Sequence, residues 1–133
     1  MNKYLKMVLY GLIVWLVPFL VSFAFVDRQG NFIVDETFFK SIMVVTGALA
    51  GVVLAVGYFR YVETNYLNEG IVLGLIWLVI NLALDLSMVY GGFFDMSVTQ
   101  YFTDIGMRYL SMPIYTIGMG YALMQKTKIL TTR

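Results

Sequence analysis

The chain has 133 residues, of which 60% are hydrophobic and 13% are charged, and its formal net charge is +1. A soluble domain carries about 25% charged residues, so this composition is typical of an integral membrane protein. The near-neutral charge gives no basis for binding nucleic acid, and we expect no nucleic-acid partner.

The sequence contains no cysteine and no histidine, which excludes several kinds of membrane chemistry. Disulfide oxidoreductases need paired thiols, and bundle cytochromes need histidine ligands for the haem iron. Zinc sites and nucleophile–histidine pairs also lose their usual components. We therefore expect no metal, no cofactor and no enzymatic activity.

Residues 5–26 form the first apolar segment, with Lys3 and Lys6 at its start. About 20 residues at roughly 1.5 Å each match a hydrocarbon core of about 30 Å, so we expect a membrane span. Pro18 lies inside this segment and removes one helical hydrogen bond, which predicts a kink.

Residues 38–61 form the second apolar segment, after a polar connection that contains a Gly-Asn turn signal. Gly47, Gly51 and Ala55 recur at every fourth residue along it. Small residues at this spacing let another helix pack closely. The sequence leaves open whether that helix belongs to the same chain or to another subunit.

Residues 70–91 and 104–125 form the third and fourth apolar segments. Glycine commonly follows the end of a helix, so Gly91 is expected to terminate the third. Pro113 predicts a kink or a break in the fourth. The sequence therefore predicts an all-α fold, with residues 1–133 forming a single domain of four transmembrane helices in a bundle.

Lysine and arginine are unevenly divided between the two ends of this predicted bundle. The N-terminus, the second connection and the C-terminal tail carry Lys3, Lys6, Arg60, Lys126, Lys128 and Arg133, whereas the other end carries Arg28, Lys40 and Arg108. The positive-inside rule then places both termini in the cytoplasm. We expect a multi-pass protein of the cell (plasma) membrane, whose surroundings are the lipid bilayer.

The third segment carries an amide and a carboxylate one helical turn apart, Asn81 and Asp85. An ionisable group inside a membrane costs about 2.5–3.5 kcal/mol on translocon scales, so it normally has a partner or a task. Arg108 lies at a similar depth and can bind a carboxylate through two parallel hydrogen bonds. Helical spacing adds further polar groups, and the predicted intramembrane cluster is Asn81, Asp85, Asp104, Arg108, Ser111 and Tyr115.

Three interpretations of the Asp85–Arg108 pair stay open. The pair is a clamp that fixes helix register, or Asp85 is a titrating or cation-binding site, or the two groups are solvated separately near the surface. The first interpretation predicts a structural or accessory protein that contacts a second copy or a partner membrane protein. The alternative is an oligomeric small-solute or ion transporter or channel, with a polar site at Asn81, Asp85 and Arg108.

Overall fold

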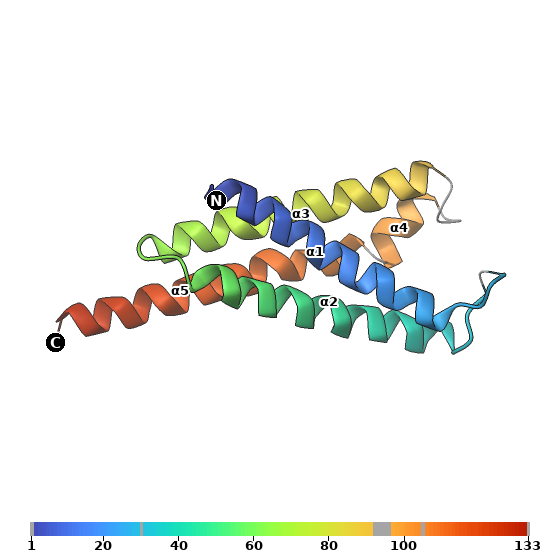
Figure 1. Ribbon diagram of the computed structural model, residues 1–133, viewed down its shortest axis with the longest axis horizontal. Coiled ribbons are helices and arrows are strands. Elements are labelled where there is room, and N and C mark those ends of the chain that lie inside the picture. The colour runs from blue at the N-terminus through green and yellow to red at the C-terminus, as the bar shows by residue number, and fades with distance from the viewer. Residues whose placement is uncertain (1, 30, 92–96, 105, 133) are drawn as a thin grey trace.

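The computed structural model describes residues 2–29, 31–91, 97–104 and 106–132. In these ranges the regular structure is helical, apart from an isolated antiparallel bridge between Val26 and Phe32. Figure 1 shows an elongated bundle of helices that run alongside one another. The elements are α1 (Lys3–Ser22), η1 (Phe23–Phe25), α2 (Glu36–Phe59), α3 (Tyr66–Tyr90), α4 (Val98–Asp104), η2 (Gly106–Leu110) and α5 (Ser111–Thr132), where η denotes a 3₁₀ helix.

Three helices in the described ranges are long and apolar enough to cross a membrane, namely α1 with its η1 extension, α2 and α3. The predicted all-helical chain with membrane-spanning helices is confirmed to this extent. The last helix, α5, is not among the three, because polar residues predominate in its final part, from Gln125 onward. A fourth membrane span therefore stays a prediction.

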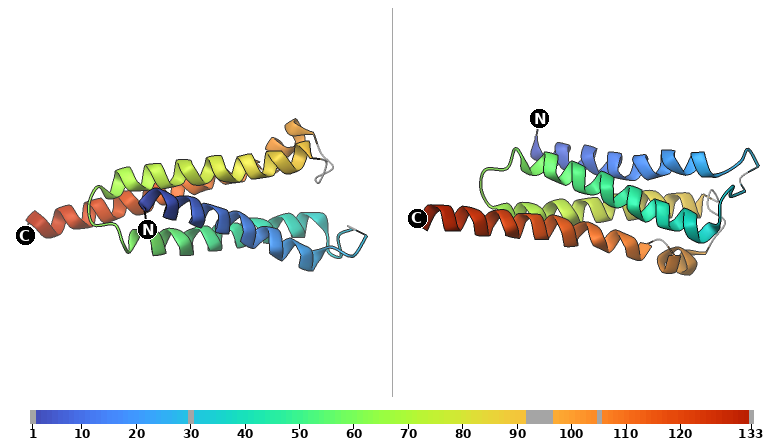
Figure 2. Two further views of the ribbon diagram at one scale, coloured as in Figure 1. Left: turned by 45° about the horizontal axis from the view of Figure 1, so that its top comes forward. Right: turned by 90° about the horizontal axis from the view of Figure 1, so that it is seen from below.

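The start of α1 and the end of α5 lie at the same end of the bundle. Figures 1 and 2 show the α2–α3 connection at this end and the α1–α2 connection at the opposite end. The last turns of α5 extend beyond the neighbouring helices. We call this end the terminal end; its cytoplasmic location stays a prediction.

The fourth apolar segment differs from the expected single helix over 104–125, because α4, η2 and α5 follow one another there. Pro113 is the third residue of α5, which begins at Ser111. In the first turn of a helix the backbone N–H has no intrahelical partner, so proline costs little there. Pro113 thus lies at the start of a helix and not in its interior. Pro18, in contrast, lies inside α1.

The largest helix–helix contact among the described elements is between α3 and α5, and glycines allow it. A Cβ on Gly74 would lie 2.5 Å from the Pro113 Cα, and one on Gly120 would lie 3.0 Å from the Tyr66 carbonyl carbon. A Cβ on Gly70 would meet the backbone of Thr116. The two backbones therefore touch at positions where any larger residue would force them apart.

The small-residue stripe of α2 packs against helices of the same chain. A Cβ on Gly51 would lie 2.8 Å from the Tyr115 Cζ, and one on Gly47 would lie 3.7 Å from the Pro18 Cγ. Ala55 is completely buried. This contact is within the chain, and a contact of the stripe with another subunit stays a prediction.

Trp77 of α3 lies in the apolar core, where it is completely buried and its indole Nε1 donates to the Met7 carbonyl at 2.9 Å. The core consists of Met7, Val14, Ala55, Tyr58, Phe59, Leu73, Trp77 and Met112. Large apolar side chains also cover the outside of the bundle, and Val45, Leu49 and Val79 are each about 65% exposed. An apolar exterior on helices of this length is what a lipid environment requires.

Candidate functional site

Asp85 is only 4% exposed, and its carboxylate accepts three hydrogen bonds. Oδ1 accepts from the Trp15 indole Nε1 at 2.6 Å. Oδ2 accepts from the hydroxyls of Tyr101 at 2.7 Å and Tyr109 at 2.6 Å. The two hydroxyl distances are usual for O–H···O hydrogen bonds, and the indole distance is shorter than is usual for an N–H···O bond. We call these four residues the carboxylate cluster.

The members of the carboxylate cluster come from four separate elements. Trp15 lies on α1, Asp85 on α3, Tyr101 on α4 and Tyr109 on η2. Figure 1 shows α4 beside the C-terminal part of α3. Tyr101 is completely buried although α4 has only seven residues. The cluster therefore ties the first helix and the α4–η2 segment to the centre of the bundle.

The three donors to Asp85 among the described residues are electrically neutral. An indole N–H or a phenolic O–H supplies one donor at the tip of a large apolar ring, so it brings no second charge into the interior. The Trp15 ring also stacks on Phe19, with centroids 4.8 Å apart and an interplanar angle of 16°. This stacking holds the indole in the orientation that its hydrogen bond needs.

Asn81 lies one helical turn before Asp85 and is completely buried. Its Nδ2 donates to the Trp77 carbonyl at 2.8 Å and to the Gly11 carbonyl at 3.4 Å. Its Oδ1 has no partner in the described part of the chain. A buried acceptor without a partner costs about 1–3 kcal/mol, so this oxygen is a candidate ligand for a buried water molecule or a cation.

Ser111 and Tyr115 do not join Asp85 as the helical spacing predicts. Ser111 is exposed. Tyr115 is partly buried and its hydroxyl abuts Gly51 on α2, where it has no hydrogen-bond partner among the described residues. The two residues therefore lie outside the carboxylate cluster.

The break before α5 explains this difference. The prediction assumed 100° per residue from Asp104 to Tyr115, whereas residues Gly106–Leu110 form a 3₁₀ helix with about three residues per turn. This change rotates α5 about its axis relative to the expected helix. The buried face of α5 consists instead of Met112, Thr116 and Gly120.

The side chains of Asp104 and Arg108 lie outside the described residues. The predicted ion pair between Asp85 and Arg108 therefore stays a prediction. The described residues show that neutral donors alone already supply three hydrogen bonds to the carboxylate.

Sequence reasoning did not identify the three donors. The predicted intramembrane cluster contains none of Trp15, Tyr101 and Tyr109. A signal was present, because a buried tryptophan or tyrosine usually needs a partner for its polar tip. The spacing between the donors and Asp85 gives no indication that they meet, since Trp15 is 70 residues away.

In the described ranges, no group of three or more acidic side chains gathers in a way that would hold a metal ion. The expectations of no metal, no cofactor and no enzymatic activity stay predictions. Comparisons with protein-family models, with curated proteins and with solved structures find no match to this chain. The chemistry of the carboxylate cluster is therefore the basis on which a function can be argued.

Proposed function

We propose that this chain is a non-enzymatic membrane protein with a structural or accessory role, in which the carboxylate cluster fixes the arrangement of the helices. One observation carries the proposal: a single buried carboxylate accepts hydrogen bonds from three other elements. Each hydrogen bond to a charged group contributes about 1.5–3 kcal/mol, so three of them offset much of the cost of burying the charge.

Such a cluster specifies the register of the helices, that is, which residues of neighbouring helices lie side by side. A shift of α1 by one residue turns the helix by about 100°, which would move Trp15 away from Asp85 and leave the indole N–H and Oδ1 without each other as partners. Apolar side chains alone discriminate poorly between registers, because lipid and leucine are equally apolar. The carboxylate cluster thus supports one arrangement of α1, α3 and the α4–η2 segment over its neighbours.

The same proposal includes the topology. α5 crosses the bilayer as a fourth span, both termini lie in the cytoplasm, and the protein resides in the cell membrane. The common location of the helix ends at the terminal end supports an even number of crossings. The partners of the protein are lipid and either a second copy of the chain or another membrane protein, which the apolar exterior can contact.

Thermal unfolding in detergent micelles tests the proposal with Asp85→Asn. The asparagine amide places its own N–H donors opposite the indole and hydroxyl donors of the cluster, so at least one hydrogen bond is lost. We expect the free energy of unfolding to fall by about 1.5–3 kcal/mol. Asp35→Asn is the matched control, because Asp35 is exposed and its side chain makes no capping hydrogen bond. Equal melting of the two variants would contradict the proposed role.

A second candidate function, an oligomeric small-solute or ion transporter, is favoured by Asn81 Oδ1 and the Tyr115 hydroxyl. Both are buried polar atoms without a partner among the described residues, as expected of groups that coordinate an ion during transport. Proteoliposomes loaded with a cation-sensitive dye separate the two functions. Flux above that of empty liposomes, abolished by Asn81→Leu, would favour transport. Dye signals identical to those of empty liposomes would favour the structural role.

A further inference from the structure

A second polar cluster lies at the terminal end of the bundle, away from Asp85. The Lys3 Nζ lies 2.9 Å from Glu69 Oε1, and the Tyr58 hydroxyl donates to Glu69 Oε2 at 2.6 Å. Lys3 begins α1, Tyr58 is near the end of α2 and Glu69 is in the first turn of α3. Because these positions are the ends of three candidate membrane spans, the cluster lies at the depth of lipid headgroups.

Two further charged residues lie beside this cluster, one of each sign. The Lys6 Nζ is 3.5 Å from the centroid of the Tyr61 ring, a cation–π contact that holds the ammonium at the surface. Glu63 is exposed in the α2–α3 connection. In the part of the chain that the structure describes, neither Lys6 nor Glu63 has an ion-pair partner. Both charges are thus available to a molecule from outside.

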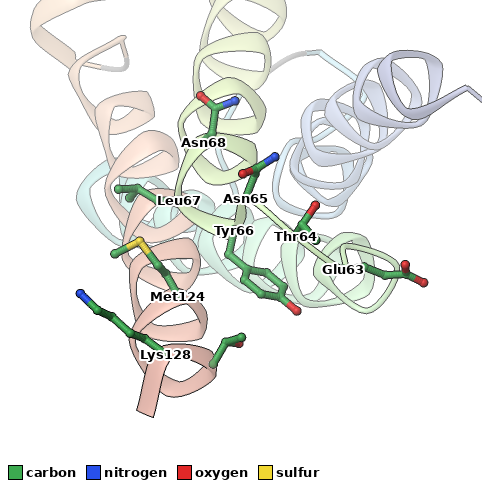
Figure 3. Close-up of a pocket in the computed structure, with 9 residues that line it drawn as sticks. Glu63, Thr64, Asn65, Tyr66, Leu67, Asn68, Met124 and Lys128 are labelled. Carbon is green, nitrogen blue, oxygen red and sulfur yellow. The ribbon is translucent and has the colours of Figure 1, made fainter. Parts of the chain in front are cut away.

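A hollow of about 260 Å³ joins these groups; its lining residues are Lys3, Lys6, Tyr58, Tyr61, Val62, Glu63, Thr64 and Glu69. A neighbouring hollow of about 530 Å³ shares Glu63 and Thr64 and continues toward Met124 and Lys128 of α5. Figure 3 shows the Glu63 carboxylate pointing away from these two α5 residues. Glu63 and Thr64 therefore line both hollows.

We propose that the hollow beside Lys6 and Glu63 binds the headgroup of a phospholipid that carries a primary ammonium, such as phosphatidylethanolamine. Lys6 donates to the phosphate oxygens, Glu63 accepts from the ammonium, and the Thr64 hydroxyl bonds to either. The lipid tails extend into the bilayer along the apolar exterior of α1. This site goes beyond the structural role proposed above and does not depend on Asp85.

Charge balance selects this headgroup over its alternatives. The hollow is lined by two lysines and two glutamates, and Lys3 and Glu69 neutralise each other. An anionic headgroup would satisfy Lys6 but would leave Glu63 facing a negative charge. A choline headgroup has the correct net charge but no N–H donor for the glutamate. Only an ammonium with N–H groups completes both interactions.

Native mass spectrometry of the delipidated full-length protein tests the proposal. The protein is titrated with phosphatidylethanolamine, phosphatidylcholine and phosphatidylglycerol of identical acyl chains. We expect the one-to-one adduct with phosphatidylethanolamine to form at about tenfold lower lipid concentration than the other two adducts, because only this lipid makes both charge-assisted hydrogen bonds. Equal adducts for all three lipids, or preferred phosphatidylglycerol, would overturn the proposal.

Two variants resolve the headgroup contacts. Glu63→Gln should reduce the binding of phosphatidylethanolamine to the level of phosphatidylcholine and leave the binding of phosphatidylcholine unchanged. Lys6→Gln should weaken the binding of all three lipids. Lys6→Arg should restore binding, since arginine also contacts phosphate and stacks on Tyr61. Glu36→Gln and Lys40→Gln are matched controls, because they make the same charge changes at the opposite end of the bundle. Loss of the lipid preference in these controls would also overturn the proposal.

Discussion

Two carboxylates on α3 lie at opposite ends of the bundle and have different partners. Glu69, at the terminal end, binds the lysine Lys3 and one tyrosine hydroxyl, and the Lys3 side chain is 54% exposed. Asp85, near the other end, is buried and accepts from one indole and two hydroxyls. At the headgroup level a long cationic side chain can reach its partner and still contact water. For Asp85, the donors among the described residues are neutral.

The comparison teaches that a charge within a bundle can be held in two ways with different energetic consequences. An ion pair whose lysine is exposed can exchange part of its interaction for water, so losing it costs less. A buried carboxylate and its donors have no such substitute, so every loss leaves unpaired groups in the interior. The following predictions test this difference, beginning with the largest effect.

Asp85→Leu compared with Glu69→Leu should give the largest difference in stability. We expect Asp85→Leu to destabilise the protein by about 3–5 kcal/mol, because buried Tyr101 and partly buried Trp15 and Tyr109 lose their acceptor. Glu69→Leu should cost less, about 1–3 kcal/mol, because Lys3 can turn to water and only the buried Tyr58 hydroxyl loses its acceptor. Unfolding by a denaturing detergent in mixed micelles measures both. Equal losses at the two positions would show that burial does not distinguish them.

Tyr109→Phe compared with Tyr58→Phe removes one hydroxyl from each carboxylate while the ring remains. Tyr109→Phe should destabilise by about 1.5–3 kcal/mol, because Asp85 loses a charged hydrogen bond that water does not replace. Tyr58→Phe should cost less, since Glu69 keeps its ion pair with Lys3. Thermal unfolding followed by tryptophan fluorescence measures the effect. A larger loss for Tyr58→Phe would reverse the comparison.

Gly74→Ala compared with Gly118→Ala tests the close contact of α3 with α5, which supports the backbone around both carboxylates. The methyl group at position 74 would meet the Pro113 backbone, so we expect a loss of about 1–3 kcal/mol. The methyl group at position 118 meets nothing within 4 Å, and alanine favours a helix over glycine by up to about 1 kcal/mol. Circular dichroism on heating should show opposite shifts, and two losses of similar size would be inconsistent with the contact.

Lys3→Gln should have the smallest effect, and salt should abolish it. The lysine side chain is largely exposed, so its attraction to Glu69 is screened when the Debye length falls to about 3 Å at 1 M salt. The Asp85→Asn effect should be unchanged by salt, because ions do not reach the buried carboxylate. Melting curves at low and high ionic strength measure both. A salt-dependent Asp85→Asn effect would show that the carboxylate cluster is open to water.

The sequence was sufficient to predict the membrane character and to identify Asp85 as a residue that needs a partner. Long apolar segments can be recognised from composition alone, and a carboxylate within such a segment can be recognised in the same way. The stripe of Gly47, Gly51 and Ala55 also indicated a helix face that another helix can approach, since the spacing of small residues is local information.

The identity of the donors could not be predicted in this way. Tyr101 reaches Asp85 only because α4 folds back onto α3, and its 16-residue distance from Asp85 says nothing about that path. Ser111 and Tyr115 were predicted from a continuous helical period, which the 3₁₀ helix at Gly106–Leu110 interrupts. Local rules thus predict which side chains are costly, whereas the chain path decides which ones meet.

The order of the carboxylate cluster along the chain has a consequence for biosynthesis. Trp15 and Asp85 leave the ribosome before Tyr101 and Tyr109, so the carboxylate enters the bilayer with one of its eventual donors already made. A polypeptide that stops before residue 101 has the Asp85 carboxylate in the bilayer without its two tyrosine donors. The incompletely hydrogen-bonded carboxylate distinguishes the truncated product from the full chain, and membrane proteases and insertion factors can detect such a feature.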